Sequence, residues 1–184
     1  MNKNSAQLRF DIISKYIPEN SIGCELGVFK GDFSRFLLSK KPNKLFLVDP
    51  WYRLSPTWNW VTNQNNSTFD AFMDILQTFE HQIKAGTVVP IVEFSKIFLS
   101  TAPPKYFDFI YLDTSHEYHN TIDELSLIPN ILKPNGILLG DDWREDISHK
   151  HYGVTKAVKE FIAAGRCKLL FTPINLQWGV TFNE

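Results

Sequence analysis

The segment GCELGVFKGDFS, residues 23–34, decides the fold, because it joins a short apolar strand to an amphipathic helix. Residues 21–26 predict a buried strand with one acid, Glu25, near its end, and residues 33–38 begin a helix with an apolar stripe. Gly27 and Gly31 lie in the turn between them, where glycine allows positive φ and lets the backbone approach a ligand. Because the unpaired N–H groups at the start of the helix point at the turn, the segment predicts a nucleotide-type cofactor site.

The glycine spacing and Glu25 narrow the choice of cofactor. A dinucleotide fingerprint would read G-x-G-x-x-G, which this segment lacks. A carboxylate here would repel a pyrophosphate but would suit a cationic ligand. The pattern E-x-G-x-x-x-G, from Glu25 to Gly31, resembles the first motif of class I S-adenosylmethionine-dependent methyltransferases, whose ligand carries a sulfonium and an ammonium. The residues alone leave one alternative open, an ordinary tight turn that follows an acid.

The composition describes one globular domain without a general affinity for polyanions. The chain has 184 residues, of which 43% are hydrophobic, and a formal net charge of −1. These values predict a single soluble domain over residues 1–184, with no nucleic-acid or membrane partner, and they leave a homo-oligomer open. No apolar run approaches the roughly 18 residues of a membrane span, and the polar start of the chain suggests no signal peptide. Cys24 and Cys167 predict buried reduced thiols, and we expect a cytoplasmic protein.

Helical and strand-like segments alternate along the chain. The alternation predicts an α/β, Rossmann-like fold, in which a mostly parallel sheet carries helices on both faces. The last two strands leave no room for a helix between them, so they should pair antiparallel. This order resembles the class I methyltransferase fold over nearly the whole chain. The expected helices are 5–16, 33–40, 68–84, 95–99, 121–132 and 154–164, and the expected strands are 21–26, 44–48, 88–92, 107–112, 137–139, 167–172 and 178–182.

Residues that directly follow the strands should meet a ligand, because open α/β sheets bind ligands beyond the carboxyl ends of their strands. Asp49 follows the second strand and can accept both hydroxyls of a ribose, as in NAD folds. Phe94 and Ser95 follow the third strand, where Phe94 can stack on an adenine and Ser95 can bond it or cap its own helix. The D/N-P-P-Y motif of DNA amino-methyltransferases does not fit D-P-W-Y at 49–52, because that motif belongs after the fourth strand. The resemblance implies this cofactor-binding set: Glu25, Gly27, Phe29, Gly31, Ser34, Asp49, Trp51, Phe94, Ser95 and Asp113.

Three acids follow the fourth and fifth strands, namely Asp113, Asp141 and Asp142. Neighbouring strands should bring them together, and such carboxylates repel one another unless a cation lies between them. An all-oxygen set favours a hard ion such as Mg²⁺, although Asp141 or Asp142 could instead cap a helix or turn. The set resembles the metal site of catechol-type O-methyltransferases. With the D-T-S-H-x-Y pattern at 113–118, it is similar to the small bacterial group of macrocin-type sugar O-methyltransferases and cephalosporin-hydroxylase-like proteins.

Histidines beside the acids are the candidate proton acceptors. His116 can take a hydroxyl proton as a general base beside Asp113, and it can also bind metal or cap the next helix. A zinc site of Asp113, His116 and His119 is disfavoured, because no cysteine or third histidine completes it. His149 and His151 lie in the segment 144–152. This segment could form a wall of a substrate pocket, but its sequence favours a solvated loop.

These residues predict an enzyme that transfers a methyl group from S-adenosylmethionine to a hydroxyl of a small molecule, with Mg²⁺ assistance. A loop over 53–66 and Trp143 would supply apolar walls for the acceptor. One alternative is a cephalosporin-hydroxylase-like oxidative enzyme, although the sequence makes no iron triad of two histidines and one carboxylate evident. Another is a catalytically silent S-adenosylmethionine-binding protein, which would be expected to lose the three acids.

Overall fold

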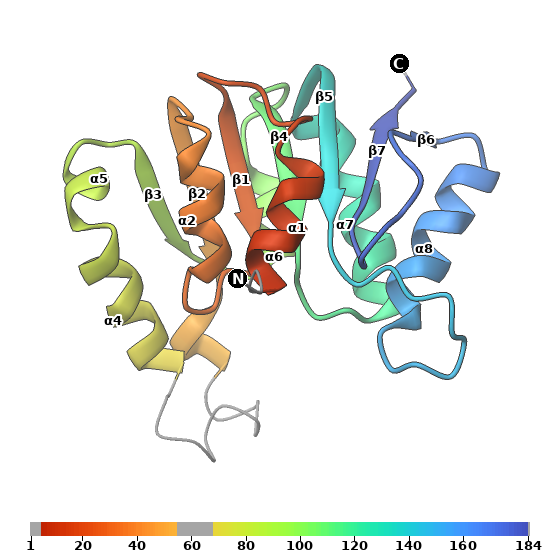
Figure 1. The fold of residues 1–184 in the computed structure, drawn as a ribbon, viewed down its shortest axis with the longest axis horizontal. Coiled ribbons are helices and arrows are strands. Elements are labelled where there is room, and N and C mark those ends of the chain that lie inside the picture. The colour runs from red at the N-terminus through yellow and green to blue at the C-terminus, as the bar shows by residue number, and fades with distance from the viewer. Residues whose placement is uncertain (1–4, 55–67, 184) are drawn as a thin grey trace.

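A computed structural model describes residues 5–54 and 68–183 of the chain (Figure 1). Strands and helices alternate from the first helix to the last strand, as the apolar spacing predicts. In chain order the elements are α1 (Ser5–Ile13), β1 (Ile22–Leu26), α2 (Asp32–Ser39), β2 (Lys44–Asp49), the 3₁₀ helix η1 (Trp51–Leu54), α4 (Thr68–Thr78), α5 (Glu80–Lys84), β3 (Val88–Val92), α6 (Ser95–Thr101), β4 (Phe107–Leu112), α7 (Tyr118–Ile131), β5 (Leu132–Gly140), α8 (Tyr152–Ala163), β6 (Cys167–Leu169) and β7 (Trp178–Phe182).

Within the described residues, seven strands form one sheet in the order β3-β2-β1-β4-β5-β7-β6. The pairs β1·β2, β2·β3, β1·β4 and β4·β5 are parallel, whereas β7 runs antiparallel to both β5 and β6. The predicted Rossmann-like sheet with an antiparallel C-terminal pair is therefore confirmed. Because β1 lies at the reversal of strand order, its carboxyl end is where a ligand is expected to bind.

Helices cover both faces of the sheet, and each face has its own apolar core (Figure 1). On one face α1, α2 and α4 bury residues such as Ile13, Leu37 and Ile75 against the sheet. On the other face α6, α7 and α8 bury Leu99, Ile128 and a further run of aliphatic side chains. Both cysteines are buried and free, as predicted. The sheet is thus fixed on both faces, which holds the residues at its edges in place.

Several elements, such as α1 and β6, differ from the expected bounds by up to three residues at an end, and two segments differ in kind from the sequence expectation. The turn expected at 133–136 lies inside β5, where Asn135 has a φ of 63° and the register with β4 shifts between Phe107 and Phe109. The strand can therefore begin at Leu132, before the turn, and resume after it. The single helix expected over 68–84 is divided into α4 and α5 at Phe79, which leaves the helical conformation while its side chain stays buried in the core.

The carboxyl ends of β1, β4 and β5 meet at the lower edge of the sheet in Figure 1. The loop expected over 53–66 falls outside the described residues from residue 55 onward, and Arg53 and Leu54 belong to η1.

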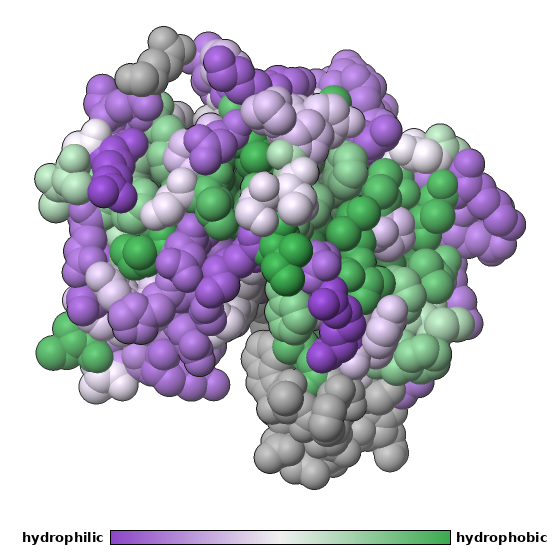
Figure 2. All heavy atoms as spheres, turned by 180° about the vertical axis from the view of Figure 1, so that it is seen from behind, coloured by the Kyte–Doolittle hydropathy of each residue, from purple (hydrophilic) through white to green (hydrophobic). Residues whose placement is uncertain are grey.

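Seen from behind, hydrophobic residues gather in the middle and on one half of the surface, while hydrophilic residues dominate the other half (Figure 2). Among the described helices, none combines the length and the apolar character that crossing a membrane requires.

Candidate active site

The glycine turn after β1 has the predicted backbone conformation. Its glycines are explained by packing against neighbouring segments of the protein, and not only by a ligand. Gly27 and Gly31 have φ values of 86° and 76°, so both adopt the left-handed conformation that glycine tolerates. A β-carbon on Gly27 would lie 1.9 Å from the backbone oxygen of Asp113, and one on Gly31 would lie 2.5 Å from a methyl group of Ile75. The glycines are therefore required by the neighbouring protein segments, whatever ligand the turn holds.

Glu25 is a buried carboxyl group directly before this turn. Its side chain is 2% exposed, and its Oε2 accepts a hydrogen bond of 2.5 Å from the Ser34 hydroxyl of α2. Burial raises the pKa of Glu25 from its usual 4.5 to about 8. A cationic ligand placed beside this carboxyl would oppose that rise. The predicted residues Glu25 and Ser34 are thus brought together in a site whose chemistry suits an ammonium group.

Asp49 binds the backbone of the glycine turn. Its Oδ2 accepts hydrogen bonds from the N–H groups of Val28 and Phe29 at 2.9 and 3.0 Å, and its Oδ1 accepts one from Trp51 at 2.7 Å. Burial raises the pKa of Asp49, and these three donors act against the rise. Trp51 is fully buried and donates its indole N–H to the Phe29 carbonyl at 2.8 Å. We therefore correct one expectation: the ring of Trp51 supports the turn from the core and presents no face to a ligand.

The segment after β3 connects to the segment after β4 through a buried acid of α7. Ser95 donates to Glu124 Oε1 at 2.5 Å, and Thr114 donates to Oε2 of the same carboxyl at 3.0 Å. Burial raises the pKa of Glu124 to about 7. Ser95 makes no capping bond, so the alternative that it caps its helix is wrong. The Arg53 guanidinium lies 5.0 Å from the ring centroid of Phe94. Phe94 nevertheless stays at the surface, with 38% of the residue exposed.

Arg9 of α1 lies between two of the three predicted acids. Its Nη1 is 3.2 Å from Asp113 Oδ2 and forms a short hydrogen bond with Asp141 Oδ2. Its guanidinium also lies 5.0 Å from the ring centroid of Phe33. Asp141 Oδ1 accepts a hydrogen bond of 2.6 Å from Gln177, so both of its carboxylate oxygens are engaged. Burial and Asp113 raise the pKa of Asp141, while Arg9 lowers it.

The third acid, Asp142, faces two histidines. Its Oδ2 is 3.2 Å from His116 Nε2 and 2.9 Å from His151 Nδ1, and its Oδ1 accepts hydrogen bonds from Arg144 at 3.1 and 3.3 Å. Burial works to raise the pKa of Asp142, but the two histidines and Arg144 outweigh it and lower the pKa. His116 Nε2 is also 2.9 Å from Asp113 Oδ1. Burial lowers the pKa of His116, but its bond to Asp113 and the nearby acids raise it overall.

The structure thus groups the predicted residues differently from the sequence interpretation. The three acids lie along one edge, but Arg9 joins two of them and the histidines face the third. Neither Asp141 nor Asp142 is the capping residue of a described helix, so the part of that alternative that places them at a helix cap is wrong. Among the described residues, the ligand atoms that could hold an ion together, all within 4.8 Å of one another, belong to His116, Asp142 and His151. His119 is exposed and stands apart from that group.

Two sequence interpretations of the histidines are corrected by this group. His151 is not part of a solvated loop, because it is 23% exposed and its Nδ1 is buried. A set of two histidines and one carboxylate does exist, although the sequence did not make it evident. It was hidden because His151 precedes α8 in a segment without hydrophobic periodicity. Its position depends on how α8 packs against the turn after β4.

Sequence reasoning also missed Arg9 and Glu124. Arg9 interrupts an apolar run in α1, between Leu8 and Phe10, which could have drawn attention to a buried partner. Glu124 lies one turn after Thr121 on the buried side of α7, where an apolar residue would be expected. A charged residue on the buried stripe of a helix is therefore the signal that both positions share.

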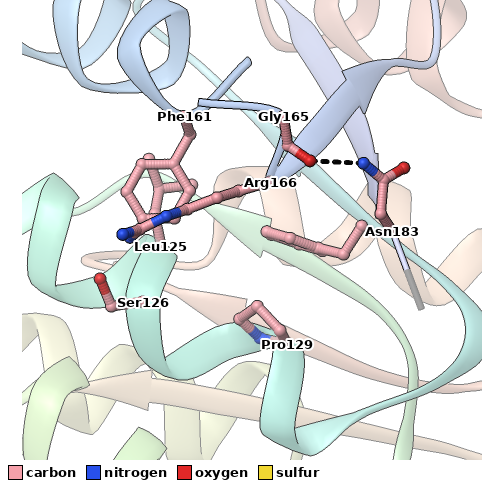
Figure 3. A pocket seen from close by; sticks show the side chains of 8 residues that line it. Leu125, Ser126, Pro129, Phe161, Gly165, Arg166 and Asn183 are labelled. Carbon is pink, nitrogen blue, oxygen red and sulfur yellow. Dashed lines mark hydrogen bonds between the residues drawn. The ribbon is translucent and has the colours of Figure 1, made fainter. Parts of the chain in front are cut away.

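One pocket lies away from this cluster, between the ends of α7, α8 and β7 (Figure 3). Its volume is about 320 Å³, and at its rim the Gly165 carbonyl accepts a hydrogen bond from the Asn183 side chain at 2.5 Å. None of the residues that the sequence predicted for the site lines this pocket. The lining residues are Leu125, Ser126, Pro129, Phe161, Gly165, Arg166, Phe182 and Asn183. We therefore place the candidate site at the strand ends.

Comparisons with known proteins show the family of the chain. A family model described as "Methyltransferase domain" matches residues 24–143, from β1 to the residues that follow β5, which is more than half of the chain. No match was found among curated proteins.

Solved structures share the fold at low sequence identity. A methyltransferase candidate from Streptococcus mutans, in complex with S-adenosylhomocysteine, has a TM-score of 0.60 and 17% identity over 98% of this chain and 97% of that chain. The N-methyltransferase NodS from Bradyrhizobium japonicum has a TM-score of 0.67 and 14% identity over 100% of both chains. The 1,6-didemethyltoxoflavin-N1-methyltransferase from Burkholderia thailandensis, with bound 1,6-didemethyltoxoflavin and S-adenosylhomocysteine, has a TM-score of 0.64 and 11% identity over 97% of this chain and 77% of that chain. Together with the family match, these structures identify the chain as a member of the methyltransferase domain family, with the class I fold.

Proposed function

We propose that this protein transfers a methyl group from S-adenosylmethionine to a hydroxyl of a small molecule. The single observation that carries the proposal is the buried Glu25, which lies directly before the glycine turn and has a pKa raised to about 8. Burial disfavours the charged form of this carboxyl more than the nearby Arg9 favours it, and an ammonium group would stabilise that charged form. Two of the solved structures with this fold carry bound S-adenosylhomocysteine, which supports the same cofactor here.

The residues present fit S-adenosylmethionine by their chemistry. Glu25 would accept hydrogen bonds from the ammonium group of the cofactor. Asp49 retains one lone pair, on Oδ1, for a ribose hydroxyl beyond its three backbone bonds. Phe94, at the surface after β3, offers a ring on which an adenine can stack. When bound, the cofactor supplies an activated methyl group, and the protein has to align the acceptor and remove a proton.

His116 is the proposed proton acceptor for the hydroxyl. Its side chain is 24% exposed, so an acceptor molecule can reach it, and Asp113 holds its ring at 2.9 Å. The neighbouring acids raise the pKa of His116, which makes its neutral form a stronger base. Asp113 also lies against Gly27, since its backbone oxygen occupies the space that a side chain there would need. The proton acceptor is thereby held close to the turn that would bind the cofactor.

Mg²⁺ assistance was the other part of the sequence prediction, and the acids as they lie here do not fit it. The Arg9 guanidinium occupies the space between Asp113 and Asp141, and Gln177 engages the second oxygen of Asp141. An ion bound by all three acids would require Arg9 to leave, so no step of the proposed reaction uses Mg²⁺. Mg²⁺ dependence stays a prediction, and chelator sensitivity of turnover tests it.

Two exposed aromatic side chains beside the strand ends support the proposed class of acceptor. Tyr52 and Phe69 are 44% and 53% exposed and pack edge to face, which offers an apolar wall to a planar or partly apolar acceptor. We propose an acceptor of the kind used by macrocin-type O-methyltransferases or a phenol. We further propose that the chain acts as one domain, in the cytoplasm, without a nucleic-acid or membrane partner.

One observation favours a second function, a metal-dependent oxidative enzyme of the cephalosporin-hydroxylase-like group. His116, Asp142 and His151 form a set of two histidines and one carboxylate, which is typical of non-haem iron sites. Oxygen consumption that depends on Fe²⁺ and on an acceptor, without any methyl transfer, would support this second function over the first.

Calorimetry tests the cofactor first. We expect S-adenosylhomocysteine to bind and NAD not to bind, and Glu25→Ala should weaken binding by at least tenfold, or about 1.4 kcal/mol, as expected for a lost charge-assisted hydrogen bond. Labelled S-adenosylmethionine with phenols, sugars and macrolides then tests the acceptor. Tight NAD binding with no binding of S-adenosylhomocysteine would overturn the proposal.

A further inference from the structure

His116, Asp142 and His151 come from three separate parts of the fold and meet at one point. His116 lies in the turn between β4 and α7, Asp142 follows β5, and His151 is the residue before α8. The rings of His116 and His151 are 4.4 Å apart between centroids and tilted by 34°. One ring nitrogen of each faces the same carboxylate oxygen, Asp142 Oδ2, at 3.2 and 2.9 Å.

The contacts around the three residues leave one carboxylate oxygen and two ring nitrogens directed at one another. Arg144 binds Asp142 Oδ1, so the carboxylate turns its Oδ2 toward the histidines. His151 Nδ1 is buried and makes no hydrogen bond of acceptable geometry, although it lies close to that oxygen. A buried nitrogen without a hydrogen bond is unfavourable unless another partner binds it. An ion held between this nitrogen and Asp142 Oδ2 would satisfy both atoms.

Two residues of the cluster hold a strained backbone conformation. His116 and Asp142 have φ values of 61° and 62°, in the left-handed region that side-chain-bearing residues rarely adopt. Residues held there cost on the order of 1 kcal/mol or more each, and they gather at ligand sites. A β-carbon on Gly153 would lie 2.6 Å from the Tyr118 nitrogen and 3.2 Å from the His116 carbonyl. The glycine thus permits the close approach that brings His151 to His116.

We propose that His116 Nε2, Asp142 Oδ2 and His151 Nδ1 together bind one divalent transition-metal ion, such as Zn²⁺ or Fe²⁺. Imidazole nitrogens select these ions over Mg²⁺ and Ca²⁺, which prefer oxygen ligands. Three protein ligands leave coordination positions open, as in catalytic sites rather than structural ones. Arg144 acts as the positioning residue of the carboxylate, because it holds the oxygen that does not face the ion.

This site does not rest on the proposed methyl transfer, since ion binding needs neither cofactor nor acceptor. It also differs from an ion held by the three acids, because only Asp142 belongs to both sets. An ion would occupy His116 Nε2, the atom that lies nearest to Asp113. In the ion-bound protein the imidazole would be a ligand, and the ion would supply the acidity that an acceptor hydroxyl needs.

Binding of Co²⁺ to chelator-treated protein tests the proposal, because Co²⁺ bound by nitrogen and oxygen ligands absorbs visible light. We expect one equivalent to bind with a visible spectrum, Zn²⁺ to displace it, and Mg²⁺ at the same concentration not to displace it. His151→Ala and Asp142→Asn should each weaken Co²⁺ binding by about a hundredfold, since even a partner of a ligand contributes about 10–100-fold. Circular dichroism of each variant checks that it folds.

Two matched controls use histidines outside the cluster. His119 is exposed and only three residues from His116, and His81 is exposed on α5. His119→Ala and His81→Ala should each leave Co²⁺ affinity and the visible spectrum unchanged. The proposal is overturned if the wild type binds no Co²⁺, or if His151→Ala binds it as tightly as the wild type. Binding of S-adenosylhomocysteine, measured on the same samples, reports on the proposed function separately.

Discussion

Glu25→Gln should remove a pH dependence of stability that the wild type carries. The folded protein holds the pKa of Glu25 at about 8, whereas the unfolded chain ionises near the usual 4.5. Between these two values the folded state binds more protons than the unfolded state, so the free energy of unfolding falls as pH rises. The raised pKa therefore works against folding above about pH 4.5, and its effect levels off once pH passes the folded pKa.

The magnitude follows from the size of the shift. At about 1.4 kcal/mol per pKa unit, the contribution of Glu25 to the stability of the wild type should fall by about 3 kcal/mol by pH 7 and about 5 kcal/mol by pH 9, relative to pH 4. Glutamine keeps the oxygen that accepts the Ser34 hydroxyl but cannot ionise. The variant should therefore gain stability over the wild type progressively from about pH 5 to pH 8.

Urea denaturation of the ligand-free protein at several pH values measures this difference. Any constant effect of the substitution cancels, because only the change with pH is compared. Glu19→Gln is the matched control, since Glu19 is exposed just before β1 and its loss should leave the pH dependence of the wild type in place. Parallel stability curves for wild type and Glu25→Gln would refute the reasoning, because Glu25 would then ionise alike in both states.

Three further substitutions test the rest of the site. Arg9→Met should destabilise the protein by about 2–4 kcal/mol at neutral pH in thermal unfolding, because Asp141 loses its cation. Mg²⁺ should also raise Tm more in this variant than in the wild type. His116→Ala should lower the methyl-transfer rate by about 10²–10⁴-fold with cofactor affinity unchanged by calorimetry, and full activity would make His116 structural. Gly27→Ala should cost more than about 3 kcal/mol in urea unfolding, whereas Gly86→Ala, with equally positive φ but open space, should cost about 1 kcal/mol.

The sheet was predictable because buried strands read as short apolar runs between breaking residues. Val88–Val92, Phe107–Leu112 and Trp178–Phe182 begin and end where the sequence predicts. The turn inside β5 was predicted, but the pairing of Leu132 before it was not, because register depends on the neighbouring strand. Periodicity therefore identified the elements, and contacts between elements decided their bounds.

The site was predictable where topology alone places a residue. Asp49 ends β2, and Asp113 and Asp141 directly follow β4 and β5, so their positions depend only on strand order. Arg9 could not be predicted in the same way, because it lies 104 residues before Asp113 and reaches it only through the packing of α1 on α2 and the sheet. His151 likewise depends on the close approach of α8 that Gly153 permits.

The contact between Gly27 and the backbone oxygen of Asp113 bears on how relatives of this protein can be sorted. Selection on folding alone would preserve a glycine at position 27, even in a lineage that had stopped binding the cofactor. A buried acid at position 25 has no such protection, because its raised pKa makes it a burden to the ligand-free fold. Drift should therefore replace Glu25 early once catalysis is abandoned. The presence of Glu25, more than that of the glycines, therefore distinguishes active relatives from relatives that keep only the fold.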